Sequence, residues 1–107
     1  MTEVPEVIGS LTHLRELWMD ANRIKDLPDF LGNLVRLVHL EVSLNHISRV
    51  TGAIGRCVAL ADFSATTNDL KALPDTIGDC ASLVTLKLDD NQIEELPFSV
   101  GKVRFTV

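Results

Sequence analysis

The sequence predicts an α/β solenoid, in which each turn supplies one strand of a parallel sheet and returns through a short helical or 3-10 segment. Three observations predict this fold. The sequence repeats with a period of 23 residues, its core residues are aliphatic, and apolar residues alternate with polar ones at the start of each repeat. A single repeat cannot bury its own apolar side, so the repeats are expected to stack around a continuous core.

The 23-residue period appears in several residue types at once. Large apolar residues recur at the centre of each expected strand, at Leu17, Leu40, Phe63 and Leu86. Glycine recurs in each return segment, at Gly9, Gly32, Gly55, Gly78 and Gly101. Asparagine recurs where each strand ends, at Asn22, Asn45, Asn68 and Asn91. Proline follows the same spacing with one gap, at Pro5, Pro28, Pro74 and Pro97, and Thr51 stands in the gap.

The period divides residues 1–107 into successive units of one domain. We expect a half repeat over 1–13, full repeats over 14–36, 37–59, 60–82 and 83–105, and an irregular tail over 104–107. Thr106 falls where the pattern expects leucine. Neither end carries a polar cap, which would leave apolar surface open. We therefore expect a segment of a longer array, or a truncated product.

Each position in the repeat has a physical role. Leu17 and Met19 alternate with Glu16, Trp18 and Asp20, which is typical of a half-buried strand. Strands of successive repeats are expected to stack about 4.8 Å apart and to line the concave face of a right-handed solenoid. The return is expected to begin at the proline, whose fixed φ suits a first helical turn. Glycine is expected where a Cβ would strain the bend or crowd the next turn.

The four asparagines form what we call the asparagine column. An amide side chain offers two donors and an acceptor. Turned inward, each can satisfy backbone groups of its own loop and of the neighbouring one. Losing such a buried bond would cost roughly 1–3 kcal/mol. We therefore expect a structural role for the column.

Composition excludes several classes of function. The chain of 107 residues is too short for a TIM barrel or a two-domain Rossmann enzyme. Its net charge of −5 is opposite to that of most nucleic-acid-binding proteins, so no nucleic acid is expected as a partner. No apolar run reaches the length of a transmembrane helix. The acidic, proline-broken start does not fit a signal peptide, and two cysteines make no disulfide framework, so we expect a cytoplasmic protein.

The outward strand positions form the candidate binding surface. The candidate residues on this concave face are Glu16, Trp18, Asp20, His39, Glu41, Asp62, Lys87 and Asp89. The same rows contain Ser43, Ser64, Thr66 and Thr85, and a fourth row at the strand ends contains Ala21, Leu44, Thr67 and Asp90. Six acidic residues face one lysine in these rows, which favours a protein partner with a basic surface. The alternative is that the acidic positions only keep the protein soluble.

Trp18 points to the concave face by alternation and is a hot-spot candidate. Packing against a preceding repeat is the competing interpretation. Cys57 and Cys80 share one repeat position, and we interpret them as small core residues rather than a disulfide.

No metal, cofactor or enzymatic activity is expected. His39, beside Glu16 and Asp62, lacks the four convergent ligands of a structural zinc site. Ser, His and Asp side chains do occur, but on an expected flat, open face without a pocket.

The quoted positions identify the unit as a leucine-rich repeat. The segments Ile8-Gly9-Ser10-Leu11-Thr12-His13-Leu14-Arg15-Glu16-Leu17-Trp18 and Leu70-Lys71-Ala72-Leu73-Pro74-Asp75-Thr76-Ile77-Gly78 resemble the Scribble/Erbin/Densin family of cell-polarity scaffolds. The resemblance implies a non-enzymatic adaptor that associates peripherally, through partners, with the basolateral cortex or junctions. The alternatives are a Ras-pathway adaptor, whose repeats are similar, and a repeat fragment without independent function. A further open point is whether Phe105, Thr106 and Val107 have a function of their own.

Overall fold

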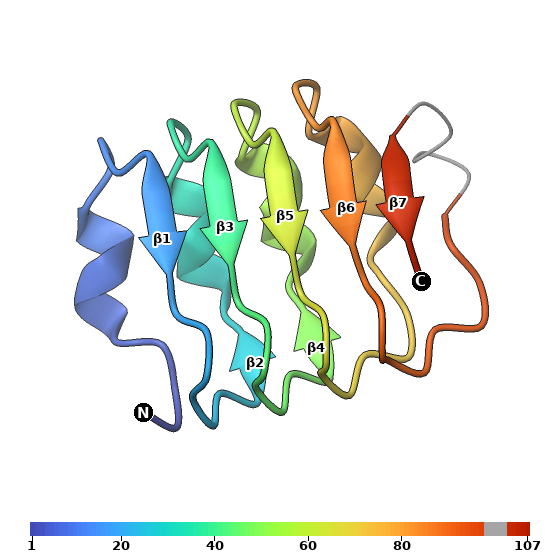
Figure 1. Cartoon of the computed structure of the whole chain (residues 1–107). Helices are drawn as coiled ribbons and strands as arrows, with labels where there is room; N and C mark the ends of the chain where they lie inside the picture. The colour runs from blue at the N-terminus through green and yellow to red at the C-terminus, as the bar shows by residue number, and fades with distance from the viewer. Residues whose placement is uncertain (98–102) are drawn as a thin grey trace.

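The structure is a computed structural model and describes residues 1–97 and 103–107. Five parallel strands lie side by side in the order β1-β3-β5-β6-β7, with the returning 3-10 helices behind them (Figure 1). The strands of this sheet are β1 (Glu16–Trp18), β3 (His39–Glu41), β5 (Asp62–Ser64), β6 (Thr85–Lys87) and β7 (Arg104–Thr106). The 3-10 helices are η1 (Glu6–Ser10), η2 (Asp29–Asn33), η3 (Gly52–Arg56) and η4 (Asp75–Asp79).

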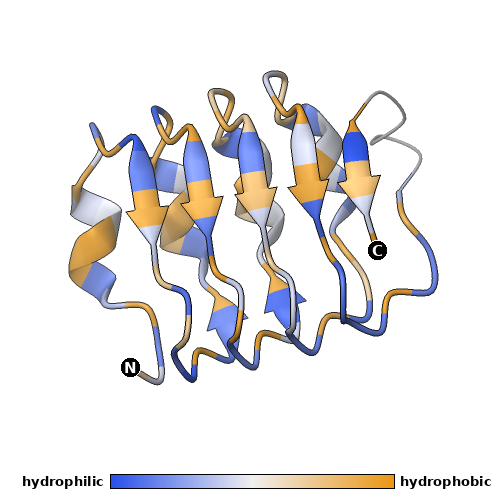
Figure 2. Ribbon diagram, viewed as in Figure 1, coloured by the Kyte–Doolittle hydropathy of each residue, from blue (hydrophilic) through white to orange (hydrophobic). Residues whose placement is uncertain are grey.

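The repeat period sets the register of the sheet. Leu17, Leu40, Phe63 and Leu86 are paired in one line, each 23 residues after the last. All four side chains are buried, and Figure 2 shows the hydrophobic middle of each strand between more polar neighbours. The core lies between this sheet and the 3-10 helices. The predicted solenoid of parallel strands with short 3-10 returns is confirmed.

The prolines lie one step earlier than expected. Pro28 has an extended backbone, with φ −78° and ψ 165°, and directly precedes η2. Pro5 and Pro74 precede η1 and η4 in the same way. The expectation that proline occupies the first helical turn was wrong, because the chain is still extended there and turns only at the next residue.

Thr51 makes contacts that a proline could not make. Its N–H donates to Leu27 O at 3.2 Å, which extends the small parallel sheet of β2 (Asp26–Leu27) and β4 (Arg49–Val50). Its hydroxyl oxygen accepts a bond from Ala53 N at 3.1 Å, which caps η3, and the hydroxyl donates to Asp29. Since proline has no N–H, this replacement adds a backbone bond.

At Gly9, Gly32 and Gly55, glycine is required by close packing of neighbouring 3-10 helices. A Cβ at Gly32 would lie 2.8 Å from Ala53 O, and a Cβ at Gly9 would lie 2.9 Å from Phe30 Cβ. None of the described glycines has a positive φ. Of the two reasons expected for glycine, crowding of the next turn therefore applies. Gly101 lies outside the described residues.

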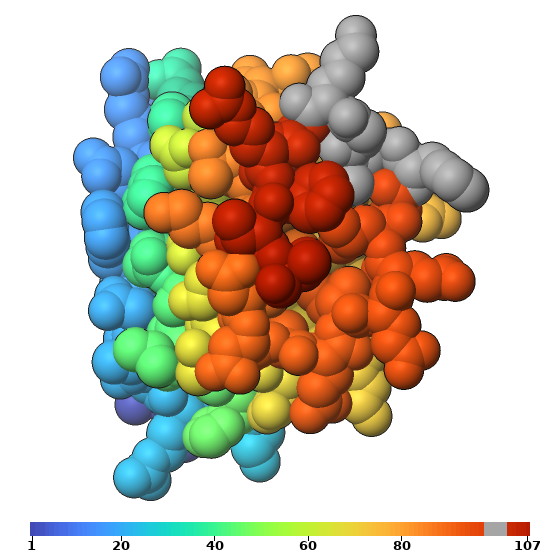
Figure 3. All heavy atoms as spheres, turned by 45° about the vertical axis from the view of Figure 1, so that its right-hand side comes forward, coloured from blue at the N-terminus to red at the C-terminus, as the bar shows by residue number. Residues whose placement is uncertain are grey.

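The expected irregular tail over 104–107 instead forms strand β7. Phe105 pairs with Leu86, which it follows by 19 residues rather than by the repeat length of 23. Thr106 therefore lies opposite Lys87 and not at a leucine position. Arg104 N donates to Val84 O at 2.9 Å, and Leu88 N donates to Thr106 O at 2.8 Å. Pairing satisfies backbone groups along the edge of β6, which explains the strand despite the broken period. Figure 3 shows β7, in red, beside the orange residues that precede it.

No helix within 1–97 or 103–107 has the length and hydrophobicity needed to cross a membrane.

Candidate functional site

The sheet face turned away from the 3-10 helices, which we call the open sheet face, brings the predicted site residues together. Its first row runs through paired residues Glu16, His39, Asp62, Thr85 and Arg104. Its second row runs through Trp18, Glu41, Ser64, Lys87 and Thr106. Because strand residues alternate between faces, both rows lie opposite the buried central line. Asp20 and Asp89 follow beyond the strands and are exposed.

Trp18 is held in a defined position although its side chain is exposed. The residue is 60% exposed, and its indole N–H donates to Glu16 Oε1 at 3.3 Å. The indole and the His39 ring have centroids 4.5 Å apart and planes inclined by 30°. His39 Nδ1 lies 3.9 Å from Asp62 Oδ2. The arrangement presents a large aromatic surface whose orientation is restricted before any partner arrives.

The open sheet face is hollowed rather than flat, which corrects the expectation of a surface without a pocket. A hollow of about 180 Å³ is lined by His39, Glu41, Asp62, Phe63, Ser64, Thr85 and Lys87. Glu41 Oε1 accepts a bond from Ser43 N at 2.8 Å, which fixes that carboxylate. The hollow therefore combines two carboxylates, two hydroxyls, an imidazole and one ammonium group, while the Phe63 side chain is buried in the core on the other side of the sheet.

Two serines expected on the binding surface are buried. Ser43 is 8% exposed and Ser64 is 9% exposed. Their hydroxyl oxygens lie 3.0 Å apart, and Ser43 Oγ also accepts bonds from Thr66 N and Thr66 Oγ1. Neighbouring side chains largely cover these small residues, and both hydroxyls take part in internal hydrogen bonds, although Ser64 still lines the hollow.

The structure adds a cation that the sequence pattern did not place on this face. Arg104 continues the first row, because β7 pairs with β6. With Lys87, it places a second basic residue on the β6–β7 side of the face. The acidic residues Glu16, Asp20, Glu41 and Asp62 belong to the first three repeats. Asp89 and Asp90 are exposed in the same repeat as Lys87, so the two cations lie beside acidic residues.

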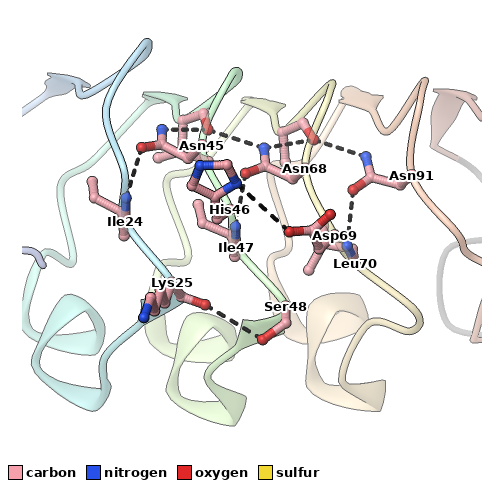
Figure 4. Close-up of polar contacts among 12 residues, drawn as sticks. Ile24, Lys25, Asn45, His46, Ile47, Ser48, Asn68, Asp69, Leu70 and Asn91 are labelled. Atoms are coloured by element: carbon pink, nitrogen blue, oxygen red, sulfur yellow. Dashed lines mark hydrogen bonds and ion pairs between the residues drawn. The ribbon is translucent and has the colours of Figure 1, made fainter. Parts of the chain in front are cut away.

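The asparagine column lies inward and connects adjacent repeats (Figure 4). Asn45 Oδ1 accepts a bond from Ile24 N at 3.0 Å, and its amide donates to Met19 O and Val42 O. Asn68 and Asn91 repeat these bonds one and two turns later. Asn22 makes two bonds, to Met19 O and Asp20 O. The column therefore holds the strands that carry the open sheet face in place.

The residue before each asparagine has a left-handed backbone conformation, which sequence reasoning missed. The φ values are 56° at Ala21, 59° at Leu44, 55° at Thr67 and 58° at Asp90. None is glycine, and Leu44 carries an exposed side chain. Residue types at this position vary, so the only signal was its fixed offset from the asparagine.

Cys57 and Cys80 are free, buried thiols in the core. Cys57 Sγ donates to Leu31 O at 3.4 Å, and Cys80 Sγ donates to Ile54 O at 3.2 Å. Burial raises the pKa of the Cys57 thiol to about 11. Burial, with the charges of Cys57 and Asp79, raises the pKa of Cys80 to about 12. Both thiols are therefore held in the protonated form at neutral pH, which is the less nucleophilic form.

These raised pKa values predict alkaline destabilisation. The folded state holds both thiol protons more tightly than the unfolded chain, so their contribution is complete below the unfolded pKa near 9.0. The free energy of unfolding should then fall as the pH rises through 9 towards 11 and 12. Urea titrations across this range measure the slope, which should flatten in a Cys57→Ala/Cys80→Ala variant. An unchanged slope in that variant would contradict the assignment to the thiols.

Within residues 1–97 and 103–107, no three His, Cys, Asp or Glu side chains form a group that could hold a metal ion.

Comparison with known proteins agrees with this architecture. Residues 13–34 match the family model described as Leucine Rich Repeat, and no curated protein sequence matches the chain. A leucine-rich repeat protein of Leptospira interrogans has a TM-score of 0.91 at 25% identity, over 99% of this chain and 28% of that one. The plant peptide hormone receptor RGFR1, solved in complex with RGF2, has a TM-score of 0.83 at 26% identity, and the match covers 97% of this chain and 19% of the receptor chain. Internalin C2 of Listeria monocytogenes has a TM-score of 0.82 at 22% identity, and the match covers 98% of this chain and 47% of the internalin chain.

The chain thus spans less than half the length of each of these three structures. Solenoids of this kind generally provide extended surfaces for protein–protein interaction. The register, the 3-10 returns, the matched residues 13–34 and these structural neighbours lead to one conclusion: the chain has the leucine-rich repeat fold.

Proposed function

We propose that the chain is a non-enzymatic protein-interaction module that binds a basic segment of a protein partner on its open sheet face. The hollow with Glu41 and Asp62 is the observation that carries the proposal. Its size is suited to one side chain rather than to a whole ligand. An ammonium or guanidinium group placed there would meet carboxylate and hydroxyl acceptors together, which favours charge-assisted hydrogen bonds.

The position of Trp18 supports the same proposal. Its ring is exposed, and contacts with Glu16 and His39 restrain its orientation. Binding of a partner therefore costs little side-chain conformational entropy at Trp18. An exposed aromatic side chain next to acidic groups can contact the aliphatic stem of a lysine or arginine and attract its charge. The complex of RGFR1 with RGF2 provides an example in which a structurally similar solenoid is found with a peptide hormone.

We further propose that the module works within a cell-polarity or signalling scaffold, in the cytoplasm and at the basolateral cortex or junctions through its partners. The support is the resemblance of residues 8–18 and 70–78 to the Scribble/Erbin/Densin family. A Ras-pathway adaptor remains the second candidate, because its repeats are similar. Imaging of the tagged chain in polarised epithelial cells separates them: lateral enrichment supports the first, and uniform cytoplasmic distribution supports the second.

The binding proposal predicts a loss of affinity when the hollow is neutralised. The probe is a short capped peptide of alternating lysine and leucine, and the readout is fluorescence anisotropy. A Glu41→Gln/Asp62→Asn variant should bind about tenfold more weakly, which corresponds to about 1.4 kcal/mol. Both substitutions keep side-chain size, so the sheet should remain folded by circular dichroism.

The matched control removes two charges away from the open sheet face. A Glu94→Gln/Glu95→Gln variant has the same net charge as the test variant, and both residues are exposed. It should weaken binding less than twofold, since exposed, distant charges are largely screened by salt. Equal losses in the two variants would mean that the acidic residues act only through net charge and would reject the proposed site.

A further inference from the structure

The loops that precede the strands form a second exposed surface, which differs from the open sheet face in composition. These loops comprise residues 11–15, 34–38, 57–61 and 80–84, and we call them together the apolar rim. The rim follows the upper edge in Figure 2, where hydrophobic colours dominate the loops before β3 and β5. Its exposed large hydrophobic side chains are Leu11, Val35, Val38, Val58 and Val84.

The fold itself does not require apolar residues at these exposed positions. The core contacts of each loop come from other residues, such as Leu34, Leu37 and Leu60, which are fully buried. In the first repeat the same exposed positions carry Thr12 and Arg15. Polar side chains are therefore compatible with the geometry, and the valines of the following repeats need another explanation.

The charges of the rim are the opposite of those on the open sheet face. The four loops contain no Asp or Glu, although the chain contains 15 acidic residues. Arg15 and Arg36 line one hollow of about 280 Å³, together with Val35, Val38 and Ala59. Two guanidinium groups thus border the same hollow as three aliphatic side chains.

Neither guanidinium group of this hollow is neutralised. Among the described residues, Arg15 and Arg36 have no carboxylate within ion-pair distance, and Arg36 Nη1 instead lies 2.7 Å from His13 Nδ1. Arg49, on the opposite side of the solenoid turn, lies 3.6 Å from Asp26 and 3.7 Å from Asp29. The rim therefore offers donors for carboxylates in a setting of exposed aliphatic groups.

We propose that the apolar rim docks an acidic, aliphatic peptide segment of a protein partner. A carboxylate of that segment binds Arg15 and Arg36 in the hollow, and its aliphatic side chains cover Val35, Val38 and Val58. Guanidinium groups suit this role, because their donors match the two oxygens of a carboxylate. This surface is separate from the open sheet face, so either proposal can fail without the other.

Methyl NMR with labelled valines tests the proposal directly. The probe is a short capped peptide of alternating glutamate and leucine, and a lysine–leucine peptide is its charge-reversed counterpart. We expect saturable shifts at Val35, Val38 and Val58 with the glutamate peptide, and none at the buried Val42. Shifts of equal size with both peptides, or no shifts at these three valines, would overturn the proposal.

Variants of the hollow identify the groups responsible. Arg15→Gln/Arg36→Gln should weaken binding of the glutamate peptide about tenfold. The control Arg23→Gln/Lys25→Gln removes two exposed charges outside the rim and should leave affinity within about twofold. Equal losses in the two variants would reject the arginine site.

A second pair of variants tests the aliphatic part. Val58→Ser replaces a residue that is 52% exposed, and Val7→Ser replaces one on η1 that is 65% exposed. Only Val58→Ser should weaken binding.

Flotation with phosphatidylserine vesicles and sedimentation velocity complete the test. Vesicle binding without peptide binding, or a dimer that Val58→Ser dissociates, would assign the rim to a membrane or to a second copy and overturn the proposal.

Discussion

Replacement of Asn68 by alanine is expected to lower the free energy of unfolding by about 3 kcal/mol. Asn68 Oδ1 accepts the bond from Ile47 N at 3.0 Å, and no other acceptor for this N–H occurs in the described part of the chain. Ile47 is fully buried, so its N–H would be left without a partner. The carbonyls that Asn68 contacts are affected less, because Val42 O and Ala65 O also accept bonds from Asn45 and Asn91.

Asn22→Ala provides the matched control for this prediction. Asn22 has the same position in its repeat, but it donates only to Met19 O and Asp20 O. Met19 O also accepts a bond from Asn45, so it retains a partner after the substitution. We expect a loss below about 1 kcal/mol. Urea unfolding, followed by circular dichroism, measures both variants, and equal losses would show that the links between repeats do not determine the cost.

The sheet could be predicted because one spacing fixes several interactions at once. Leu17, Leu40, Phe63 and Leu86 are 23 residues apart, so stacking them in one buried line also sets the register of the strands. The rows that contain Trp18 and Glu41 follow from simple alternation. The period itself therefore predicts which residues share a face.

Departures from the period could not be predicted in this way. Strand β7 forms because the edge of β6 has unpaired backbone groups, and pairing at a 19-residue step satisfies them without a repeat motif. The hollow depends on side-chain volume: Ser64 and Thr85 are small, so their neighbours enclose a space that a binary pattern does not record. The left-handed φ at Leu44 is imposed by the turn, and a leucine gives no sign of it.

The second large effect concerns two glycines in the same 3-10 helix, η3, for which we expect opposite results. A Cβ at Gly55 would lie 2.8 Å from Thr76 O and 3.0 Å from Thr76 Cβ, both of which belong to η4. Gly55→Ala therefore forces the two helices apart and should cost about 1–3 kcal/mol.

Gly52→Ala should instead raise stability by about 0.4–1 kcal/mol, because the added methyl group restricts the unfolded chain without straining the folded one. Its Cβ would meet only Thr76 Oγ1, at 3.8 Å, and the φ of Gly52 is not positive. Thr76 Oγ1 already donates to Gly52 O at 2.7 Å, so Thr76 is the neighbour of both Gly52 and Gly55. The two substitutions therefore compare a loose and a tight contact with the same residue. Urea unfolding of the two variants and of the double variant gives the comparison. If both substitutions change stability in the same direction, close contact between neighbouring repeats is not the reason for glycine at position 55.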